Sequence, residues 1–341
     1  MKTDLAFGVA GLGFGANHAR VLASLPGARL AAICDSDPSR LKQAPRPPGT
    51  KAYGDFREML AAERLDAVVI ALPAALHEEA ALAAVEAGCA LLVEKPLAPS
   101  LAAGRRLVQA AAAAGVPLMA GHIERFNPAV QEAARRVQQG EVGRVLQITA
   151  RRAGALRVPP RDLNVVHDSA IHDIDTARLI AGTEVAEAYA AAVSGVVTPL
   201  ENGIAGVLRF EAGDGQGPIA TLEVNWLSPR RLRDLVVLGE QGLLVLDYAA
   251  QTLDFYRTPE QRTGPVRDWA DSRFARGPGG TRIDIEPREQ LVAELEAFVA
   301  ALQSGGPLPV SARDALAALA VADALTESAR SGRPVVPERI E

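Results

Sequence analysis

Hydrophobic and polar positions follow two different patterns along this chain. In residues 1–122, short apolar runs such as LAFGVA and LDAVVIALP alternate with longer segments whose apolar residues recur every three or four positions. The short runs predict buried strands, and the longer segments predict amphipathic helices. Strand–helix alternation of this kind is typical of a parallel sheet covered by helices on both faces. We therefore predict an α/β domain over residues 1–122.

Longer alternating runs replace this pattern in the rest of the chain. Several such runs lie between Val185 and Tyr256, joined by turn-rich segments such as AGDGQG, which favours antiparallel pairing. Helices are expected near Glu289–Gln303 and Ala312–Ser331, and the Gly- and Arg-rich stretch 262–282 is expected to be a loop. Residues 123–341 are therefore predicted to form an α+β domain with a large, mostly antiparallel open sheet.

Composition excludes several classes of function. The 341-residue chain has a net charge of -5 and no clustered basic segment, which disfavours nucleic-acid binding. No run reaches the roughly 20 apolar residues of a membrane span. Cys34 and Cys89 stand in no metal-binding spacing and are expected to be buried thiols. We predict a cytoplasmic protein with a small-molecule substrate and with neither a nucleic-acid nor a membrane partner.

A glycine-rich turn is expected between the first strand and the first helix. In GLGFGA, Gly11, Gly13 and Ala16 satisfy the G-x-G-x-x-G/A form, which lets the backbone approach a pyrophosphate at a helix N-terminus. Asp35 follows Gly13 by 22 residues, close to the roughly 20 expected for the carboxylate that binds a ribose hydroxyl. NAD is therefore favoured over NADP, although the nearby Arg40 leaves a dual preference open.

Asp37, the second acid of CDSDP, and the turn EKP are each interpreted from their immediate sequence context. Asp37 is expected to cap the next helix. The strand LLVE leads into Lys95 and Pro96, and ligands of open parallel sheets bind beyond the carboxyl ends of the strands. Lys95 is therefore a candidate for a side chain in the crevice, with its direction fixed if Pro96 is cis. On position alone, an ordinary surface lysine is an equally good interpretation.

The segment HDSAIHDID places histidines and aspartates on a predicted helix. At about 100° per residue, Asp168, His172 and Asp175 share one face, whereas Asp173 lies away from it. A carboxylate near an imidazole can orient it, as general acid–base catalysis requires. The same face could hold a metal ion, but no further His or Cys cluster stands out, so no metal is expected. His167 is expected to face solvent or to cap the helix.

These motifs together resemble a known family. GLGFGANHARVL, VEKPLA, AGHIERFNPAV and DSAIHDID are similar to the glucose–fructose oxidoreductase and inositol dehydrogenase (Gfo/Idh/MocA) family, and the resemblance covers nearly the whole chain. It implies a Rossmann domain, an α+β domain whose sheet forms a homodimer or homotetramer interface, and last helices that can pack back on the first domain. It also implies a catalytic group of Lys95, Asp168 and His172, with the lysine on the reacting oxygen and the histidine as acid–base.

The resemblance also implies sets of binding residues. The expected cofactor residues are Gly11, Gly13, Phe14, Gly15, Ala16, Asp35, Leu72, Pro73, His77, Glu94 and Lys95. The expected substrate residues are His122, Arg125, Arg157, Arg161, Asp168 and His172. Two departures from the family pattern are visible. The glycine turn is one residue short between Gly13 and Gly15, which leaves the pose of the pyrophosphate open, and ALPAALH lacks the Thr and Asn usual near Leu72 and Ala74.

A finer resemblance concerns the substrate. GHIERFNPAV, RDLNVVHDSAIHDIDTARLIAGTEV and LEVNWLSPRRLRDLVVLGEQGLLVLDY are similar to UDP-N-acetylglucosamine 3-dehydrogenases, which oxidise the sugar C3 hydroxyl to a ketone. Arg151, Arg152, Arg157 and Arg161 offer guanidinium groups for the diphosphate, or else lie in a solvated loop. We therefore expect NAD-dependent oxidation at C3 of a UDP-N-acetylhexosamine. A dehydrogenase of a free sugar or inositol and a non-catalytic NAD-binding sensor are the alternatives, and the complete acid–base set favours an enzyme.

Overall fold

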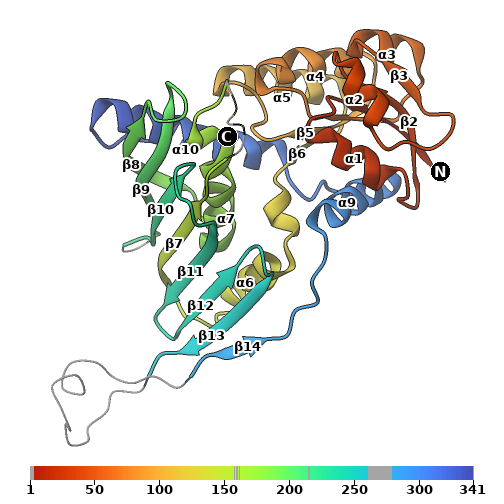
Figure 1. Cartoon of the computed structure of the whole chain (residues 1–341). Coiled ribbons are helices and arrows are strands. Elements are labelled where there is room, and N and C mark those ends of the chain that lie inside the picture. The colour runs from red at the N-terminus through yellow and green to blue at the C-terminus, as the bar shows by residue number, and fades with distance from the viewer. Residues whose placement is uncertain are drawn as a thin grey trace, which may run out of the picture.

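Two bodies, each built on one sheet, make up this protein (Figure 1). The computed structural model describes residues 4–156, 158, 160, 162–213, 216–259 and 279–340. Most of the loop expected at 262–282 therefore lies outside the described residues. Among the described residues, no helix has the length and apolar character needed to cross a membrane. A parallel sheet in the first body and a mostly antiparallel one in the second confirm the predicted fold class.

The first body is a six-stranded parallel sheet in the order β3-β2-β1-β4-β5-β6. Its strands are nearly all apolar because helices cover both faces. The chain order reverses between β1 and β4, and this switch point opens a crevice at the carboxyl ends of the strands. The strands are β1 (Leu5–Ala10), β2 (Ala28–Cys34), β3 (Lys51–Tyr53), β4 (Ala67–Ile70), β5 (Ala90–Glu94) and β6 (Leu118–Gly121). The helices are α1 (Gly15–Leu22), α2 (Pro38–Gln43), α3 (Phe56–Ala62), α4 (His77–Glu86) and α5 (Leu101–Ala114), with a 3-10 turn, η1 (Ala74–Leu76).

The second body is an eight-stranded sheet in the order β14-β13-β12-β11-β7-β10-β9-β8, in which only β7 and β10 pair in parallel. Helices cover one of its faces, and alternate side chains of the strands point into the core beneath them. The strands are β7 (Val145–Ala153), β8 (Val185–Ser194), β9 (Glu201–Phe210), β10 (Ile219–Asn225), β11 (Leu232–Gly239), β12 (Gly242–Asp247), β13 (Thr252–Arg257) and β14 (Thr281–Ile283). The covering elements are η2 (Ile123–Phe126), α6 (Pro128–Gln138), the π-helical turn η3 (Val166–Ala170), α7 (Ile171–Ala181) and α10 (Ala312–Ser331).

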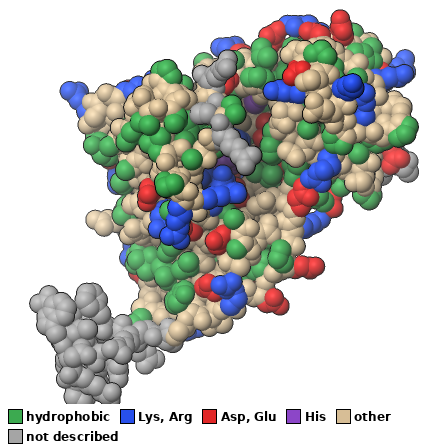
Figure 2. Space-filling view, viewed as in Figure 1, with side chains coloured by type: hydrophobic (Ala, Val, Ile, Leu, Met, Phe, Trp, Pro, Cys, Tyr) green, Lys and Arg blue, Asp and Glu red, His purple; other side chains and the backbone are tan. Residues whose placement is uncertain are grey.

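The last two helices join the bodies. Helix α9 (Gln290–Ser304) packs on the first body, where the ring of Phe298 meets the ring of Phe7 edge-on at a centroid distance of 6.2 Å. Helix α10 contributes Leu316 to the first core and Leu325 to the second. A boundary at residue 122 therefore does not separate the two cores. Figure 2 shows a hollow where the bodies meet, with histidine and Lys or Arg side chains at its edge.

Local expectations for the first body are met in two places. Asp37 caps α2, since its carboxylate accepts a hydrogen bond of 2.8 Å from the Ser39 N–H. Cys34 and Cys89 are free and buried. Burial and the nearby Asp55 raise the pKa of Cys34 to about 12, so its thiol stays protonated and unreactive at neutral pH.

Candidate active site

The glycine turn after β1 forms a cradle that a pyrophosphate fits. Gly11 has a φ of +90°, and a Cβ at this position would lie 2.5 Å from the carbonyl oxygen of Ala71, so only glycine is accommodated. Gly13 and Phe14 are exposed at the start of α1, and no side chain caps this helix. Its first N–H groups are therefore available to an anion. The residues fit NAD as the sequence analysis expected.

Asp35 stands beside this turn at the end of β2. It is 5% exposed, and its carboxylate accepts hydrogen bonds from the N–H groups of Leu12 at 2.7 Å and Asp37 at 2.8 Å. The Arg40 guanidinium approaches the same carboxylate at 3.5 Å. The backbone thus fixes the acid that would face a ribose, and a cation lies within reach of any 2′-phosphate.

His77 supports the crevice rather than facing the nucleotide. Its ring nitrogens lie 2.8 Å from the carbonyl oxygen of Leu72 and 2.9 Å from that of Pro96. The residue is 1% exposed, and burial lowers the pKa of the imidazole. His77 therefore ties the turn after β4, with Leu72 and Pro73, to the turn after β5. Both ring nitrogens thus contact backbone carbonyl oxygens, and a direct contact with the cofactor stays a prediction.

Lys95 reaches from the first body to the second. It follows β5, and the Lys95–Pro96 peptide bond is cis. Its amine donates hydrogen bonds to the Asp168 carboxylate at 3.0 Å and to the Asp168 carbonyl oxygen at 2.6 Å. The lysine predicted from the EKP turn and the aspartate predicted from the later helix thus meet in one place.

The π-helical turn η3 changes the face that the α-helical period predicted. A π turn holds more residues than an α turn, so Asp168 does not stand directly over His172. Asp168 accepts hydrogen bonds from Lys95 and from the hydroxyl of Ser169 at 2.8 Å. No hydrogen bond joins Asp168 to His172 in the described structure, so Asp168 orients the lysine and not the imidazole. Burial opposes its ionisation, but Lys95 and Ser169 outweigh burial and lower its pKa.

His172 is an uncharged base in this environment. The residue is half-buried, and its buried Nδ1 has no hydrogen-bond partner among the described residues. Burial, followed by the positive charges of Lys95 and Arg152, lowers its pKa well below 6.5. At neutral pH the imidazole therefore has a free nitrogen lone pair and can accept a proton.

Two expected substrate residues belong to a buried ion network. Arg125 is held by both oxygens of Asp175, at 2.8 and 2.7 Å, and by Asp314 at 3.2 Å. The Nδ1 atom of His122 lies 3.8 Å from Asp175, and the residue is 2% exposed. These contacts join η2, α7 and α10. His122 and Arg125 are thus held in a buried ion network, and their contact with a substrate stays a prediction. Asp175, three residues after His172 in α7, is occupied by Arg125.

The arginines proposed for a diphosphate have other partners. Arg151 points to the uncovered side of the sheet and pairs with Asp234 at 2.8 and 2.7 Å. Arg152 is buried and bonds to Asp173 and Glu124. Arg157 and Arg161 lie outside the described residues. Neither of the first two therefore stands in a solvated loop.

The remaining histidine of the segment is neither solvated nor a simple cap. The ring of His167 contacts the carboxylate of Asp323 and the side-chain oxygen of Asn164, at 2.8 and 2.9 Å. It links η3 to α10.

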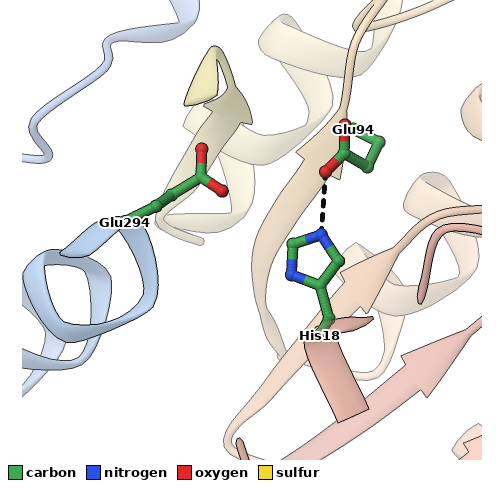
Figure 3. A group of neighbouring side chains, drawn as sticks. All are labelled: His18, Glu94 and Glu294. Carbon is green, nitrogen blue, oxygen red and sulfur yellow. Dashed lines mark hydrogen bonds and ion pairs between the residues drawn. The ribbon is translucent and has the colours of Figure 1, made fainter. Parts of the chain in front are cut away.

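A buried cluster behind the Lys95 turn was not predicted (Figure 3). Glu94 bonds to the ring of His18 at 2.8 Å and accepts the Lys95 N–H at 3.2 Å. Glu294 of α9 points toward them, is fully buried, and has no hydrogen-bond partner on either oxygen in the described structure. A signal existed, since Glu294 is an acid on the apolar face of α9 that contains Leu291. One ligand atom from each of the three side chains lies within 4.8 Å of the others, as in a metal site.

The charge states of Glu94 and Glu294 determine the role of this cluster. Two buried carboxylates at this separation repel each other unless one is neutralised. His18 and Lys95 lower the pKa of Glu94 against the effect of burial, whereas burial and then Glu94 raise that of Glu294 well above its usual value. Glu294 therefore holds a proton. The neutral acid packs beside an ionised Glu94, which fixes the backbone of Lys95.

Comparison with known proteins gives the family. Residues 5–122 match the family model described as an oxidoreductase family with an NAD-binding Rossmann fold, and residues 130–245 match that of the GFO/IDH/MocA C-terminal domain. The chain belongs to the GFO/IDH/MocA family. It is therefore an oxidoreductase that acts on CH–OH groups and uses NAD, and the alternative of a non-catalytic sensor is set aside.

Three similar proteins illustrate the range of this family. The D-apiose dehydrogenase of Paraburkholderia graminis is 31% identical over 96% of this chain and 88% of its own. The inositol 2-dehydrogenase 2 of Saccharopolyspora erythraea is 34% identical over 95% of this chain and 93% of its own. The structure of the UDP-N-acetylglucosamine 3-dehydrogenase GnnA from Acidithiobacillus ferrooxidans has a TM-score of 0.80 at 23% identity, covering 96% of this chain and 98% of that one.

The positions of Asp35 and Arg40 predict the preference of this GFO/IDH/MocA protein for NAD over NADP. Replacing Asp35→Ser removes the charge that repels a 2′-phosphate and leaves Arg40 free to bind it. We expect the NADP-to-NAD ratio of kcat/KM to rise about 10- to 100-fold, as for gaining a hydrogen bond to a charged group. Initial rates with each cofactor measure this. The control Asp55→Ser, in the cap of α3, should leave the ratio unchanged, and an equal loss with both cofactors would contradict the assignment.

The proton on Glu294 predicts a pH-dependent stability. Its folded pKa lies above the unfolded value of 4.5, so the folded state binds more protons and loses stability as the pH rises above 4.5. Glu294→Gln keeps the neutral shape and removes this loss. The variant should gain on the parent by up to about 1.4 kcal/mol per pH unit within the interval between the two pKa values.

Urea denaturation from pH 5 to 8 tests this gain, with the half-exposed Glu296→Gln on the same helix as the control. Curves of unfolding free energy against pH that run parallel for the Glu294 variant and the parent would refute a protonated Glu294. One equivalent of divalent metal in the purified protein, measured by elemental analysis, would refute it as well.

Proposed function

We propose that this protein oxidises a secondary hydroxyl of a sugar with NAD, and that the hydroxyl is C3 of a UDP-N-acetylhexosamine. The observation that carries the reaction is the contact between the Lys95 amine of the first body and Asp168 of the second, 3.0 Å apart. The positive charge of this amine helps to lower the pKa of His172, which is therefore uncharged. This contact supports an acid–base pair of Lys95 and His172 where the NAD-binding body meets the other body.

The residues supply proton control and charge stabilisation. His172 accepts the proton of the substrate hydroxyl. The Lys95 amine donates a hydrogen bond to the same oxygen and stabilises the negative charge that develops there, while Asp168 holds the amine in position. NAD, when bound, supplies the acceptor for the hydride of the carbinol carbon. The product is a ketone, and the histidine returns its proton to solvent.

Two classes of substrate are in competition. The resemblance to UDP-N-acetylglucosamine 3-dehydrogenases and the fold shared with GnnA support a nucleotide sugar. A free sugar or inositol is the second candidate, because the two relatives described above, 31% and 34% identical, are named for D-apiose and inositol.

The uncovered face of the large sheet supports assembly. A row of uncharged residues crosses six paired strands on this face: Tyr189, Val207, Thr221, Thr149, Val236 and Val245. Tyr189 and Val207 are 42% and 41% exposed. A stripe of uncharged residues on a sheet face that no helix covers is suited to a second copy of the same face. We infer that the protein is a homodimer or homotetramer through this sheet.

Replacing His172→Ala tests the assignment of the base. Loss of the proton acceptor should lower kcat by a factor of 10² to 10⁴ with little change in NAD affinity. Because the pKa of His172 lies below 6.5, the acid limb of the parent's oxidation rate should also lie below pH 6.5. NADH absorbance, with NAD and a panel of UDP-sugars, free sugars and inositol, measures both.

The matched control is His167→Ala, which removes a neighbouring imidazole outside the acid–base pair and should keep kcat. A keto-sugar acceptor is included so that NADH retained from purification does not hide turnover. Unchanged kcat in the His172 variant would end the proposed mechanism.

Assembly through the sheet predicts that Val207→Lys yields monomers. In a symmetric dimer the change places two charges in one interface and removes two apolar contacts, each worth about 1.5–3 kcal/mol. The dissociation constant should rise at least about 100-fold, which light scattering coupled to size exclusion detects. Val336→Lys, on an exposed segment outside the sheet, is the control. A parent chain that is monomeric at about 10 μM would refute the interface.

A further inference from the structure

A pocket of about 300 Å³ opens beside the acid–base pair on the second body. Its walls come from the end of β7, from η3, from the end of β10 and from the start of β11. The residues that matter are Arg152, Ser169, Trp226, Arg231 and Arg233. The pocket is linked to the site already described through Ser169, whose hydroxyl donates a hydrogen bond of 2.8 Å to the Asp168 carboxylate.

Arg233 is a half-buried cation without a carboxylate partner among the described residues. It stands directly opposite Arg152 in the β7–β11 pairing, an arrangement that is destabilising for like charges. Burial and the charges of Arg152 and Arg231 lower its pKa. A desolvated guanidinium that faces other guanidinium groups is costly unless an anion joins them.

Arg152 lines the same pocket and carries an unsatisfied donor. The residue is 4% exposed, and its guanidinium lies over the ring of Tyr248 at 5.0 Å. Two of its nitrogens bond to Asp173 and Glu124, but its buried Nη1 has no hydrogen-bond partner within the described structure. Such a group is rare unless a ligand or water completes it.

A chain of hydrogen bonds links the pocket wall to the amine. The indole N–H of Trp226 bonds to the Ser169 hydroxyl at 3.0 Å, and that hydroxyl bonds to Asp168 at 2.8 Å. Asp168 in turn holds Lys95 at 3.0 Å. A substrate anchored in the pocket is therefore placed against the same side chains that position the proposed catalytic amine.

We infer that this pocket binds the phosphate group of a phosphate-bearing sugar, with Arg233 as the central anchor, Arg231 at the exposed rim and Arg152 against the buried wall. Several guanidinium groups from different strand positions suit the spread oxygens of a phosphate or diphosphate better than a single flat carboxylate. The inference rests on the proposed sugar oxidation and makes Arg233 the residue that selects phosphorylated over neutral substrates.

Arg233→Gln tests the anchor by steady-state kinetics. With UDP-N-acetylglucosamine or a sugar monophosphate, KM should rise about 10- to 100-fold while kcat changes less than about threefold. With a neutral sugar or inositol, KM should stay the same. Comparison of the two phosphorylated substrates shows whether one phosphate or a diphosphate is read. Arg230→Gln, an exposed neighbour outside the pocket, is the control, and a uniform change across all substrates would overturn the inference.

Binding of pyrophosphate supplies a readout that does not depend on turnover. Calorimetry should show binding to the parent and a loss of at least about tenfold in both Arg233→Gln and the rim variant Arg231→Gln, whose fold is checked by thermal melting. If no sugar is oxidised but pyrophosphate binds with this dependence, the proposed reaction fails and the anion site stands. If sugars are oxidised and pyrophosphate binding is absent or unaffected, the anion site fails and the reaction stands.

Discussion

The ion pair between Lys95 and Asp168 is the interaction on which the rest of the site depends. Its two members come from different bodies, lie 73 positions apart in the chain and have side chains 17% and 25% exposed. Ion pairs in water stabilise little, but partial burial strengthens the attraction and makes each partner costly to leave alone. The main effect of the pair is therefore to restrict the position of the Lys95 amine. It fixes an amine from the nucleotide-binding body against the segment that carries His172.

Each member of the pair is held from behind. On the first body, Glu94 fixes the Lys95 backbone and is itself held by His18 and faced by Glu294. On the second body, Ser169 fixes Asp168. Helix α9 carries Glu294 back onto the first body, and α10 shares residues with both cores. Helices α9 and α10 thus do more than add packing, because they hold the two halves of the site in a fixed relative position.

Sequence reasoning found the fold class, the cofactor and the family because these depend on local patterns. Continuous apolar strands, a glycine turn followed by an uncapped helix, and Asp35 at the end of β2 are all set by neighbouring residues. Helical period misplaced Asp168 relative to His172, because one π turn at η3 changes the phase between these two residues. Glu294 and Arg233 were missed for another reason. Their roles depend on partners from distant segments of the chain, and the periodicity of the sequence does not predict those partners.

The acids of α7 show why residue type alone could not assign roles. Asp173 neutralises Arg152 and Asp175 neutralises Arg125, so both are structural counter-ions inside a helical layer. Burial of these pairs is tolerated because each is bidentate. Two groups near these pairs keep unsatisfied capacity among the described residues: His172, an uncharged imidazole whose Nδ1 has no partner, and Arg233, a cation without a carboxylate partner. A site's chemistry is carried by the groups that the fold leaves unsatisfied, and here the charges of both Lys95 and Arg233 act on His172.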